Sequence, residues 1–358
     1  MLIASGYLRH KVSLYITERF SPEHAHSTHI IQKKIMTFTP STDIPPLTNK
    51  VILVTGGSEG LGKQSVLELA MHSPAKIYLA ARNPSKAEAA RDEIQSKVSG
   101  ANNDCAPITL LNLDLSSFES VKKAASEIKA QESRLDILIA NAGVMGASGT
   151  TQNGYEMQFG VNHMGHALLI QLLLPLMRQT AQMEGVNPGE TRCVILSSEA
   201  EKFVPQKDPY PFGKLRTGCD DMGAFTRYGI SKLANLHYAS QLASRYPEAE
   251  TGIRFVSVHP GGVSTNLGDI MRGWPRTEKV VRKVVGVVLG LVPVELGAWG
   301  QLWAATWPVG KAHGIKEPTS GVFYHPVAIE GKGSKLAYDE GKAKELWEWT
   351  EKELQPHV

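Results

Sequence analysis

The sequence has few cysteines, little net charge and no evident membrane segment. Its three cysteines form no CxxC pair and lack zinc-ligand spacing, which argues against a disulfide scaffold and indicates reduced thiols in a reducing compartment. A net charge of +3 supplies no strong field for nucleic acid. The apolar run 284–294 has 11 residues, well short of the ~20 that span a bilayer. We therefore expect no nucleic-acid partner and no transmembrane span.

Internal repeats and low-complexity tracts are also absent, and a composition of 42% hydrophobic and 20% charged residues is typical of a globular protein. The first 48 residues contain no apolar segment followed by a small-residue cleavage site, which argues against a secretory signal. We expect residues 1–48 to be a poorly ordered extension of a cytoplasmic protein. Organelle targeting by residues 1–35 and a translation start at Met36 stay open as alternatives.

Strand-like and helix-like segments alternate from Lys50 onward. Apolar runs predict strands at 51–55, 76–81, 108–111, 135–140, 192–197, 253–259 and 322–324. Helical patterns cover 63–72, 84–96, 116–130, 155–177, 227–246 and 341–353. Alternation of this kind predicts a single α/β domain over residues 49–358, with a parallel sheet of about seven strands and helices on both faces.

A glycine-rich stretch, VTGGSEGLG at residues 54–62, follows the first strand and opens the first helix. Its spacing is TGxxxGxG, from Thr55 through Gly56 and Gly60 to Gly62. Such a turn brings bare backbone amides and the positive end of a helix dipole close to a diphosphate. A tight turn without a ligand is the alternative interpretation.

Five further stretches follow in order: ANAG (140–143), VNHMGHALL (161–169), VILSSEA (194–200), YGISK (228–232) and HPGGVSTNL (259–267). Together with the glycine-rich turn they resemble the short-chain dehydrogenase/reductase family, and the stretch NGYEMQFGVNHMGHALL at 153–169 is similar to its retinol dehydrogenase-like branch. The resemblance covers residues 49 to about 270. It implies a Rossmann-type doubly wound sheet and an oxidoreductase that binds a nicotinamide dinucleotide.

Tyr228 and Lys232 are four residues apart and share one face of a predicted helix. A free tyrosine, with a pKa near ~10, exchanges protons poorly at neutral pH. A neighbouring ammonium, helped by a positively charged nicotinamide, is expected to lower that pKa, so that Tyr228 is the general acid or base. The resemblance implies that Lys232 also holds the nicotinamide ribose. A buried tyrosine beside a solvated lysine is the alternative.

Ser198 follows a predicted strand, where its hydroxyl could orient a carbonyl at the carboxyl edge of the sheet. Only one of the consecutive residues Ser197 and Ser198 can face that edge, and the family pattern matches Ser198. Asn162 matches the family asparagine that kinks its helix and holds a water in the proton relay. His163 and His166 lack a carboxylate partner, so we expect packing roles and no metal.

The end of the second strand decides the choice of cofactor. NAD-binding folds usually place an acidic residue there, whereas this chain has Ala81 followed by Arg82. An arginine can bind the 2′-phosphate of NADP through charge-assisted hydrogen bonds, which favours NADP over NAD. Glu59 argues the other way, because NADP-dependent relatives often have a basic residue at that position.

The resemblance assigns further residues to the cofactor. Asp114 also suits the turn that follows its strand, and Ser116 could cap the next helix. The complete predicted cofactor set is Gly56, Ser58, Gly60, Leu61, Gly62, Arg82, Asp114, Leu115, Asn141, Ala142, Gly143, Tyr228, Lys232, Pro260, Gly261, Val263 and Thr265.

Two aromatic-rich regions, 199–226 and 267–307, lie where the family keeps its substrate lid. They predict a small hydrophobic carbonyl or alcohol as substrate. The sequence thus predicts an NADP-dependent alcohol dehydrogenase or carbonyl reductase with Asn162, Ser198, Tyr228 and Lys232 as catalytic residues. The alternative is a non-catalytic NAD(P)-binding regulatory protein of the same fold. Many relatives are homo-oligomers and others are monomers, so the oligomeric state stays open.

Overall fold

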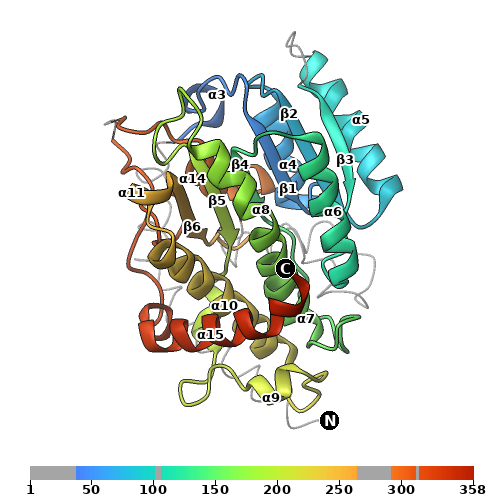
Figure 1. Cartoon of the computed structure of the whole chain (residues 1–358), viewed down its shortest axis with the longest axis vertical. Helices are drawn as coiled ribbons and strands as arrows, with labels where there is room; N and C mark the ends of the chain where they lie inside the picture. Colours follow the sequence, from blue (N-terminus) through green and yellow to red (C-terminus); the bar gives the residue numbers. More distant parts are fainter. Residues whose placement is uncertain (1–37, 101–105, 264–291, 312–313) are drawn as a thin grey trace, which may run out of the picture. The chain divides into compact units, whose positions relative to one another are not determined.

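The computed structural model describes residues 38–100, 106–263, 292–311 and 314–358. Its centre is one parallel sheet of seven strands in the order β3-β2-β1-β4-β5-β6-β7 (Figure 1). The strands are β1 (Val51–Thr55), β2 (Lys76–Ala81), β3 (Ile108–Asn112), β4 (Ile137–Ala140), β5 (Thr191–Leu196), β6 (Ile253–Val258) and β7 (Phe323–Tyr324). The predicted sheet of about seven strands is confirmed.

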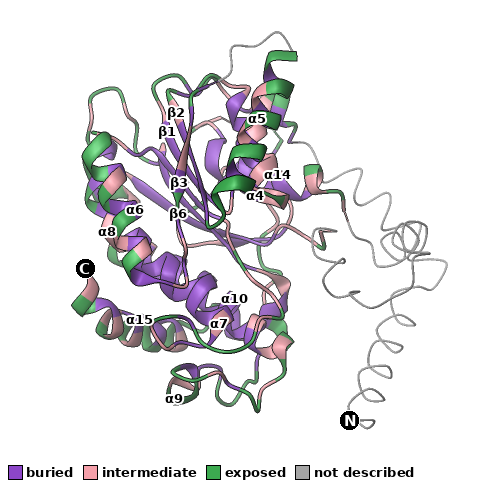
Figure 2. Cartoon of the chain, turned by 90° about the vertical axis from the view of Figure 1, so that its right-hand side faces the viewer, coloured by how far each residue is buried: buried purple, intermediate pink, exposed green. Residues whose placement is uncertain are grey.

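Helices cover both faces of this sheet, as the side view shows (Figure 2). One face carries α4, α5 and α14, and the other carries α6, α8 and α10, with α15 packed on α10 (Figures 1 and 2). The helices are α3 (Pro40–Asp43), α4 (Gly60–Ala70), α5 (Pro84–Gly100), α6 (Phe118–Gln131), α7 (Met157–Phe159), α8 (Gly165–Ala181), α9 (Phe212–Leu215), α10 (Ala224–Arg245), α11 (Glu248–Thr251), α14 (Val294–Thr306) and α15 (Glu340–Leu354). Short helical turns are η1 (Gly160–Met164), η2 (Glu199–Phe203), η3 (Leu336–Tyr338) and η4 (Gln355–His357).

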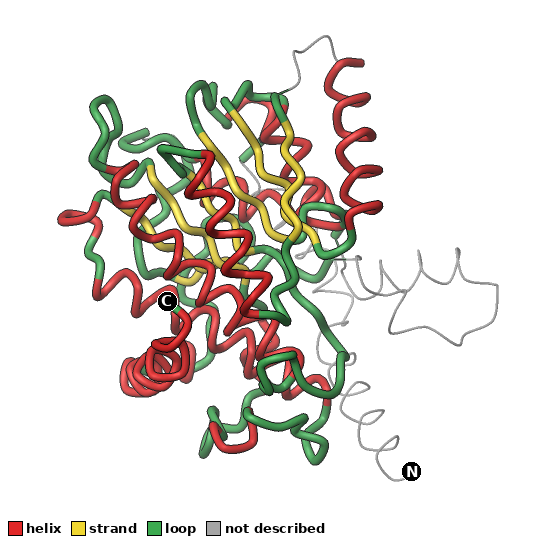
Figure 3. Tube along the Cα trace, turned by 45° about the vertical axis from the view of Figure 1, so that its right-hand side comes forward, coloured by secondary structure: helices red, strands yellow, loops and turns green. Residues whose placement is uncertain are grey.

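The strands are rich in apolar residues because the layers of helices remove both faces of the sheet from water. All residues of β1, β4, β5 and β6 are buried. In the trace view the strands lie between helical layers (Figure 3). β1 pairs with β2 on one side and with β4 on the other, so the chain order reverses between β1 and β4. Ligands of open α/β sheets bind outside the carboxyl ends of the strands at such a reversal.

Helix α6 shows how local sequence sets an element. The hydroxyl of Ser117 accepts a hydrogen bond from the Ser120 amide and caps its first turn. The buried side chains of α6 recur at helical spacing: Phe118, Val121, Ala124, Ala125 and Ile128. The cap is therefore Ser117 and not Ser116, because the Ser116 side chain and amide instead donate to Asp114 in the preceding turn.

The predicted helix 155–177 is interrupted. The turn η1 has π-helical geometry and separates α7 from α8. Glycines let this region approach its neighbours closely: a Cβ on Gly160 would lie 2.3 Å from Thr151, and one on Gly165 would lie 2.4 Å from the Leu115 carbonyl oxygen. The stretch 157–181 has the length and apolar character of a membrane-crossing helix, but most of it is buried inside the fold.

Two predicted regions fall partly outside the described residues. Residues 1–37 of the predicted extension and 267–291 of the predicted lid are among them. The rest of that lid stretch forms α14, which packs against α4. Trp303 and Trp307 are fully buried there, so they belong to the core and not to a substrate surface.

Candidate active site

The glycine-rich turn lies between β1 and α4, at the carboxyl end of β1. Gly56 and Gly60 have φ values of +67° and +57°, a region that only glycine adopts readily. A Cβ on Gly62 would lie 2.2 Å from the Gly56 carbonyl oxygen. The turn therefore cannot accept side chains at these positions, and it leaves the first amides of α4 open to an anion.

The hydroxyl of Thr55 joins this turn to the end of β4. Its Oγ1 accepts hydrogen bonds from the amides of Asn141 and Ala142, both at 3.0 Å, and lies 2.9 Å from Nε2 of His166. The Nδ1 of His166 lies 2.9 Å from the Asn162 carbonyl oxygen, which can only accept, so Nδ1 carries the proton and Nε2 accepts from Thr55. Burial lowers the pKa of His166 to about 4, which keeps the ring neutral.

Asn162 lies in the π-helical turn η1 and is fully buried. Its Oδ1 accepts from the Val144 amide at 2.8 Å, and its Nδ2 donates to the Val144 carbonyl at 3.0 Å and to the Ser231 hydroxyl at 2.9 Å. The side chain is thus fixed between the segment after β4 and helix α10. The π turn occurs where the family resemblance implies a kink at Asn162.

Lys232 is buried on α10, with Nζ 5.6 Å from the centroid of the Tyr228 ring. Nζ donates to the Leu196 carbonyl at 3.1 Å, and burial lowers the pKa of Lys232 to about 8. A Cβ on Gly143 would lie 3.4 Å from Nζ and 3.3 Å from Oδ1 of Asn162. Lys232 and Asn162 therefore meet at the backbone of Gly143, and the Tyr228 ring lies beside Lys232.

Burial raises the pKa of Tyr228 to about 12, and a hydrogen bond with the Ser198 side chain opposes the rise. The sequence-based expectation was a lowered pKa, from the charges of Lys232 and of the nicotinamide. Removal of the hydroxyl from water outweighs the hydrogen bond with Ser198, so the protein's own residues raise this pKa and do not lower it.

Ser197 and Ser198 face different ways, as the strand geometry predicts. The Ser197 hydroxyl is buried and donates a hydrogen bond to the Lys232 carbonyl at 2.7 Å, so it contacts the backbone of α10. Ser198 is half-buried, caps η2 by accepting from the Ala200 amide, and bonds Tyr228. Ser198 is thus the serine of this pair that is beside the tyrosine.

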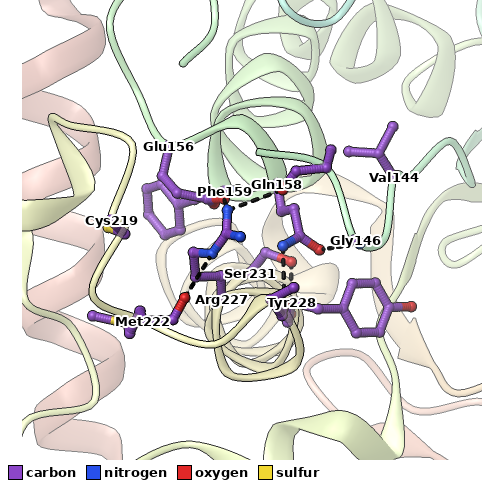
Figure 4. A network of polar contacts seen from close by, with 12 residues as sticks. Val144, Gly146, Glu156, Gln158, Phe159, Cys219, Met222, Arg227, Tyr228 and Ser231 are labelled. Atoms are coloured by element: carbon purple, nitrogen blue, oxygen red, sulfur yellow. Dashed lines mark hydrogen bonds and ion pairs between the residues drawn. The ribbon is translucent and has the colours of Figure 1, made fainter. Parts of the chain in front are cut away.

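A buried ion pair behind Tyr228 was not anticipated from the sequence. Arg227 donates to Oε1 of Glu156 at 2.8 Å and to the carbonyls of Ala147 and Met222 at 2.9 and 3.2 Å. Figure 4 shows Arg227 between Glu156 and Met222, with the Tyr228 ring pointing away from them. The partners are 71 residues apart in sequence, so no local pattern could signal the pair.

Comparison with known proteins agrees with this geometry. The family model for short chain dehydrogenases matches residues 50–206. The short-chain dehydrogenase/reductase drtF of Aspergillus calidoustus is 35% identical over 317 residues, which cover 87% of this chain and 95% of drtF. The chain belongs to the short-chain dehydrogenase/reductase family. Retinol dehydrogenase 14 of Mus musculus is a further relative, 32% identical over 308 residues that cover 84% of this chain and 85% of the relative.

Solved structures agree on the fold. The crystal structure of NADPH bound carbonyl reductase from chicken fatty liver is 24% identical, covers 80% of this chain and 100% of its own chain, and superposes with a TM-score of 0.54. The sheet and its helices form the Rossmann-type fold of short-chain dehydrogenases/reductases. As a member of this oxidoreductase family, the chain binds a nicotinamide cofactor.

The remaining residues predicted to bind the cofactor lie along the carboxyl edge of the sheet. Ser58 and Leu61 belong to the glycine-rich turn and the first turn of α4, and Arg82 is exposed directly after β2. Asp114 and Leu115 follow β3, where the Asp114 carboxylate also accepts from Ser116, so its role in the turn is observed. Pro260, Gly261 and Val263 follow β6, and Thr265 lies outside the described residues.

The two histidines of the VNHMGH stretch have packing and hydrogen-bonding contacts. His163 Nε2 lies 3.0 Å from the Thr350 hydroxyl on α15, and His166 bonds Thr55 as described above. Within the described ranges, no group of three or more His, Cys, Asp or Glu residues is placed to hold a metal ion.

Proposed function

We propose that this short-chain dehydrogenase/reductase is an NADP-dependent enzyme that interconverts a hydrophobic alcohol and its ketone or aldehyde. The observation that carries the proposal is that Tyr228 lies beside both Ser198 and Lys232, and that Lys232 and Asn162 meet at the backbone of Gly143. A protein that only binds the dinucleotide has no need for a buried lysine next to a hydroxyl pair.

The four side chains have distinct roles in the proposed reaction. The Tyr228 hydroxyl gives its proton to the carbonyl oxygen during reduction and takes it back from the alcohol during oxidation. Ser198 orients the same oxygen through its hydroxyl. Lys232 supplies positive charge beside the Tyr228 ring, and Asn162 fixes the backbone next to it. When bound, the nicotinamide cofactor supplies or accepts the hydride.

The turn fits a dinucleotide, because α4 begins at Gly60 and its first backbone amides can bind the diphosphate. Arg82 supports a preference for NADP, since it is exposed at the end of β2, where a 2′-phosphate would lie. Glu59, which argued for NAD, pairs with Lys86 at 3.2 Å. That lysine offsets the negative charge of Glu59.

Titration of the purified protein with NADPH and with NADH tests the cofactor preference. Arg82→Ala should weaken NADPH binding by tenfold or more and leave NADH binding within about twofold, because a charge-assisted bond to phosphate is lost. Arg91→Ala on α5, where Arg91 pairs with Asp92, is the matched control and should change neither. Equal losses for both cofactors in Arg82→Ala would contradict the assignment.

Turnover is tested with a panel of apolar aldehydes and ketones, followed by the loss of NADPH absorbance. Tyr228→Phe should reduce kcat by at least a thousandfold while NADPH affinity stays within about threefold, since only the proton donor is removed. Unchanged turnover would remove Tyr228 from the mechanism. NADPH binding by the wild-type protein without turnover of any panel member would favour a non-catalytic regulatory protein.

A further inference from the structure

Two phenylalanines are exposed next to Tyr228. The side chains of Phe203 and Phe225 are 57% and 49% exposed. Their rings contact each other edge to face, with centroids 4.9 Å apart, and the Phe225 centroid lies 6.5 Å from that of Tyr228. The two rings therefore extend the proposed active site with an apolar surface.

The structure separates these rings from the other aromatic residues of the predicted 199–226 lid. Tyr210 is buried, and its hydroxyl bonds Nδ1 of His237 at 2.8 Å. Phe212 stacks on Trp349 of α15 with centroids 4.8 Å apart. Both therefore pack against the body of the protein, whereas Phe203 and Phe225 remain available to a ligand.

The elements that carry the two phenylalanines also carry the proposed catalytic residues. Phe203 ends η2, whose cap is Ser198, and Phe225 lies in the first turn of α10, three residues before Tyr228. The elements touch closely, because a Cβ on Gly229 would lie 2.6 Å from the Ala200 carbonyl oxygen. The backbone segments that carry the two rings thus have a fixed position relative to those of Ser198 and Tyr228.

Exposure of two touching aromatic rings is unusual unless the surface binds something. In the described part of the chain, five large apolar or aromatic side chains are exposed, and two of them form this pair. A perpendicular pair offers the face of one ring and the edge of the other, and aromatic ligands prefer such offset or edge contacts at centroid distances of about 4.5–7 Å. Saturated chains have no such preference in geometry.

We propose that Phe203 and Phe225 are specificity residues that bind the apolar part of the substrate, and that the preferred substrate carries a flat aromatic ring on its reacting carbon. This inference rests on the proposed oxidoreductase function. It names the chemical class that the site prefers: aryl aldehydes, aryl ketones and the corresponding benzylic alcohols.

The test compares substrates of matched size and different flatness, with propanal as a small reference. The wild-type enzyme should have a kcat/KM for benzaldehyde at least tenfold above that for cyclohexanecarbaldehyde. Phe203→Ala and Phe225→Ala should each raise the KM for benzaldehyde by tenfold or more. The KM for propanal should stay within about twofold of the wild-type value, and the affinity for NADPH should not change. Val309→Ala, at another exposed apolar residue, should change none of these values. Phe203→Leu and Phe225→Leu keep the apolar area but lose the flat ring. Compared with the alanine variants, they should raise the kcat/KM for cyclohexanecarbaldehyde more than the kcat/KM for benzaldehyde.

A binding measurement separates this inference from the proposed function. Acetophenone and cyclohexyl methyl ketone are titrated into the NADPH complex of Tyr228→Phe, with and without the Phe203→Ala change. Tighter binding of acetophenone that disappears with Phe203→Ala supports the inference whether or not the wild-type protein turns over. If the enzyme turns over both aldehydes with equal kcat/KM values, and neither alanine variant changes these values, the inference is overturned while the proposed function stands. Absence of turnover for every carbonyl would overturn the proposed function, and the ketone titration would still decide the role of the two rings.

Discussion

Replacing Glu156 by glutamine should destabilise the protein strongly. Glu156 is fully buried, with Oε1 2.8 Å from Arg227 and Oε2 accepting from the Phe159 amide at 2.7 Å. A glutamine can accept only one of these bonds, and its amide group then meets a second donor. The Arg227 guanidinium, which is also buried, would lose its charge partner.

The size of the effect follows from the burial of both groups. Removing one partner of a buried ion pair typically costs about 3–5 kcal/mol, because the remaining charge is uncompensated. For a large domain, roughly 2–4 °C of Tm accompanies each kcal/mol, so Glu156→Gln should lower the Tm by about 6–20 °C. Circular dichroism at a fixed scan rate measures the change. The double variant Glu156→Gln, Arg227→Gln should recover part of the loss, because no buried charge remains.

Asp221→Asn provides the control, because Asp221 pairs with Lys214 at the surface and both side chains are more than half exposed. Water already solvates such a pair, so its Tm should not move measurably. A Tm of Glu156→Gln within 2 °C of wild type, or additive losses in the double variant, would refute the reasoning that the pair holds the start of α10.

Three further predictions concern the turn and the lysine. Gly62→Ala should abolish NADPH binding, because its Cβ would lie 2.2 Å from the Gly56 carbonyl oxygen, whereas Gly100→Ala, where a Cβ meets nothing within 4 Å, should bind normally; equal affinities would contradict this. Thr55→Val should unfold at lower urea than Thr55→Ser, because valine leaves two amides without an acceptor, at about 1–3 kcal/mol each; identical midpoints would exclude it. Burial lowers the pKa of Lys232 from 10.5 to about 8, so its charge destabilises the folded state below pH 8, and this cost disappears as the pH rises toward 10.5. Lys232→Met should therefore be more stable than wild type by about 3 kcal/mol at pH 7, with the gap closing by pH 10 in urea titrations.

The strands and long helices could be predicted because their signals are local. A buried parallel strand is a short apolar run, and β1 and β2 begin and end where the runs do. The glycine-rich turn could also be predicted from its local sequence. Its positive φ values and the lack of space for a Cβ require glycine at these positions.

Contacts between distant segments could not be predicted in this way. The resemblance implies a kink at Asn162, but no local pattern shows that the backbone of Val144, in another segment, binds the Asn162 side chain. Likewise, the aromatic residues of 199–226 look alike in sequence, and their division into core and exposed rings depends on where α15 and η2 lie. Hydrophobic pattern alone gives no information on which aromatic side chain another element will cover.

The protonation states of Tyr228 and Lys232 also could not be predicted from local sequence, and they matter for the proposed function. Tyrosine and lysine four residues apart on a helix suggest a lowered tyrosine pKa, because opposite charges attract. Burial acts on both groups in the other direction: it raises the pKa of Tyr228 to about 12 and lowers that of Lys232 to about 8. At neutral pH the protein's own residues therefore keep the proton on Tyr228, which is the form required to protonate a carbonyl oxygen. In the proposed oxidation of an alcohol the phenolate is the base, and positive charge near the ring would lower the pKa of Tyr228 toward the working range.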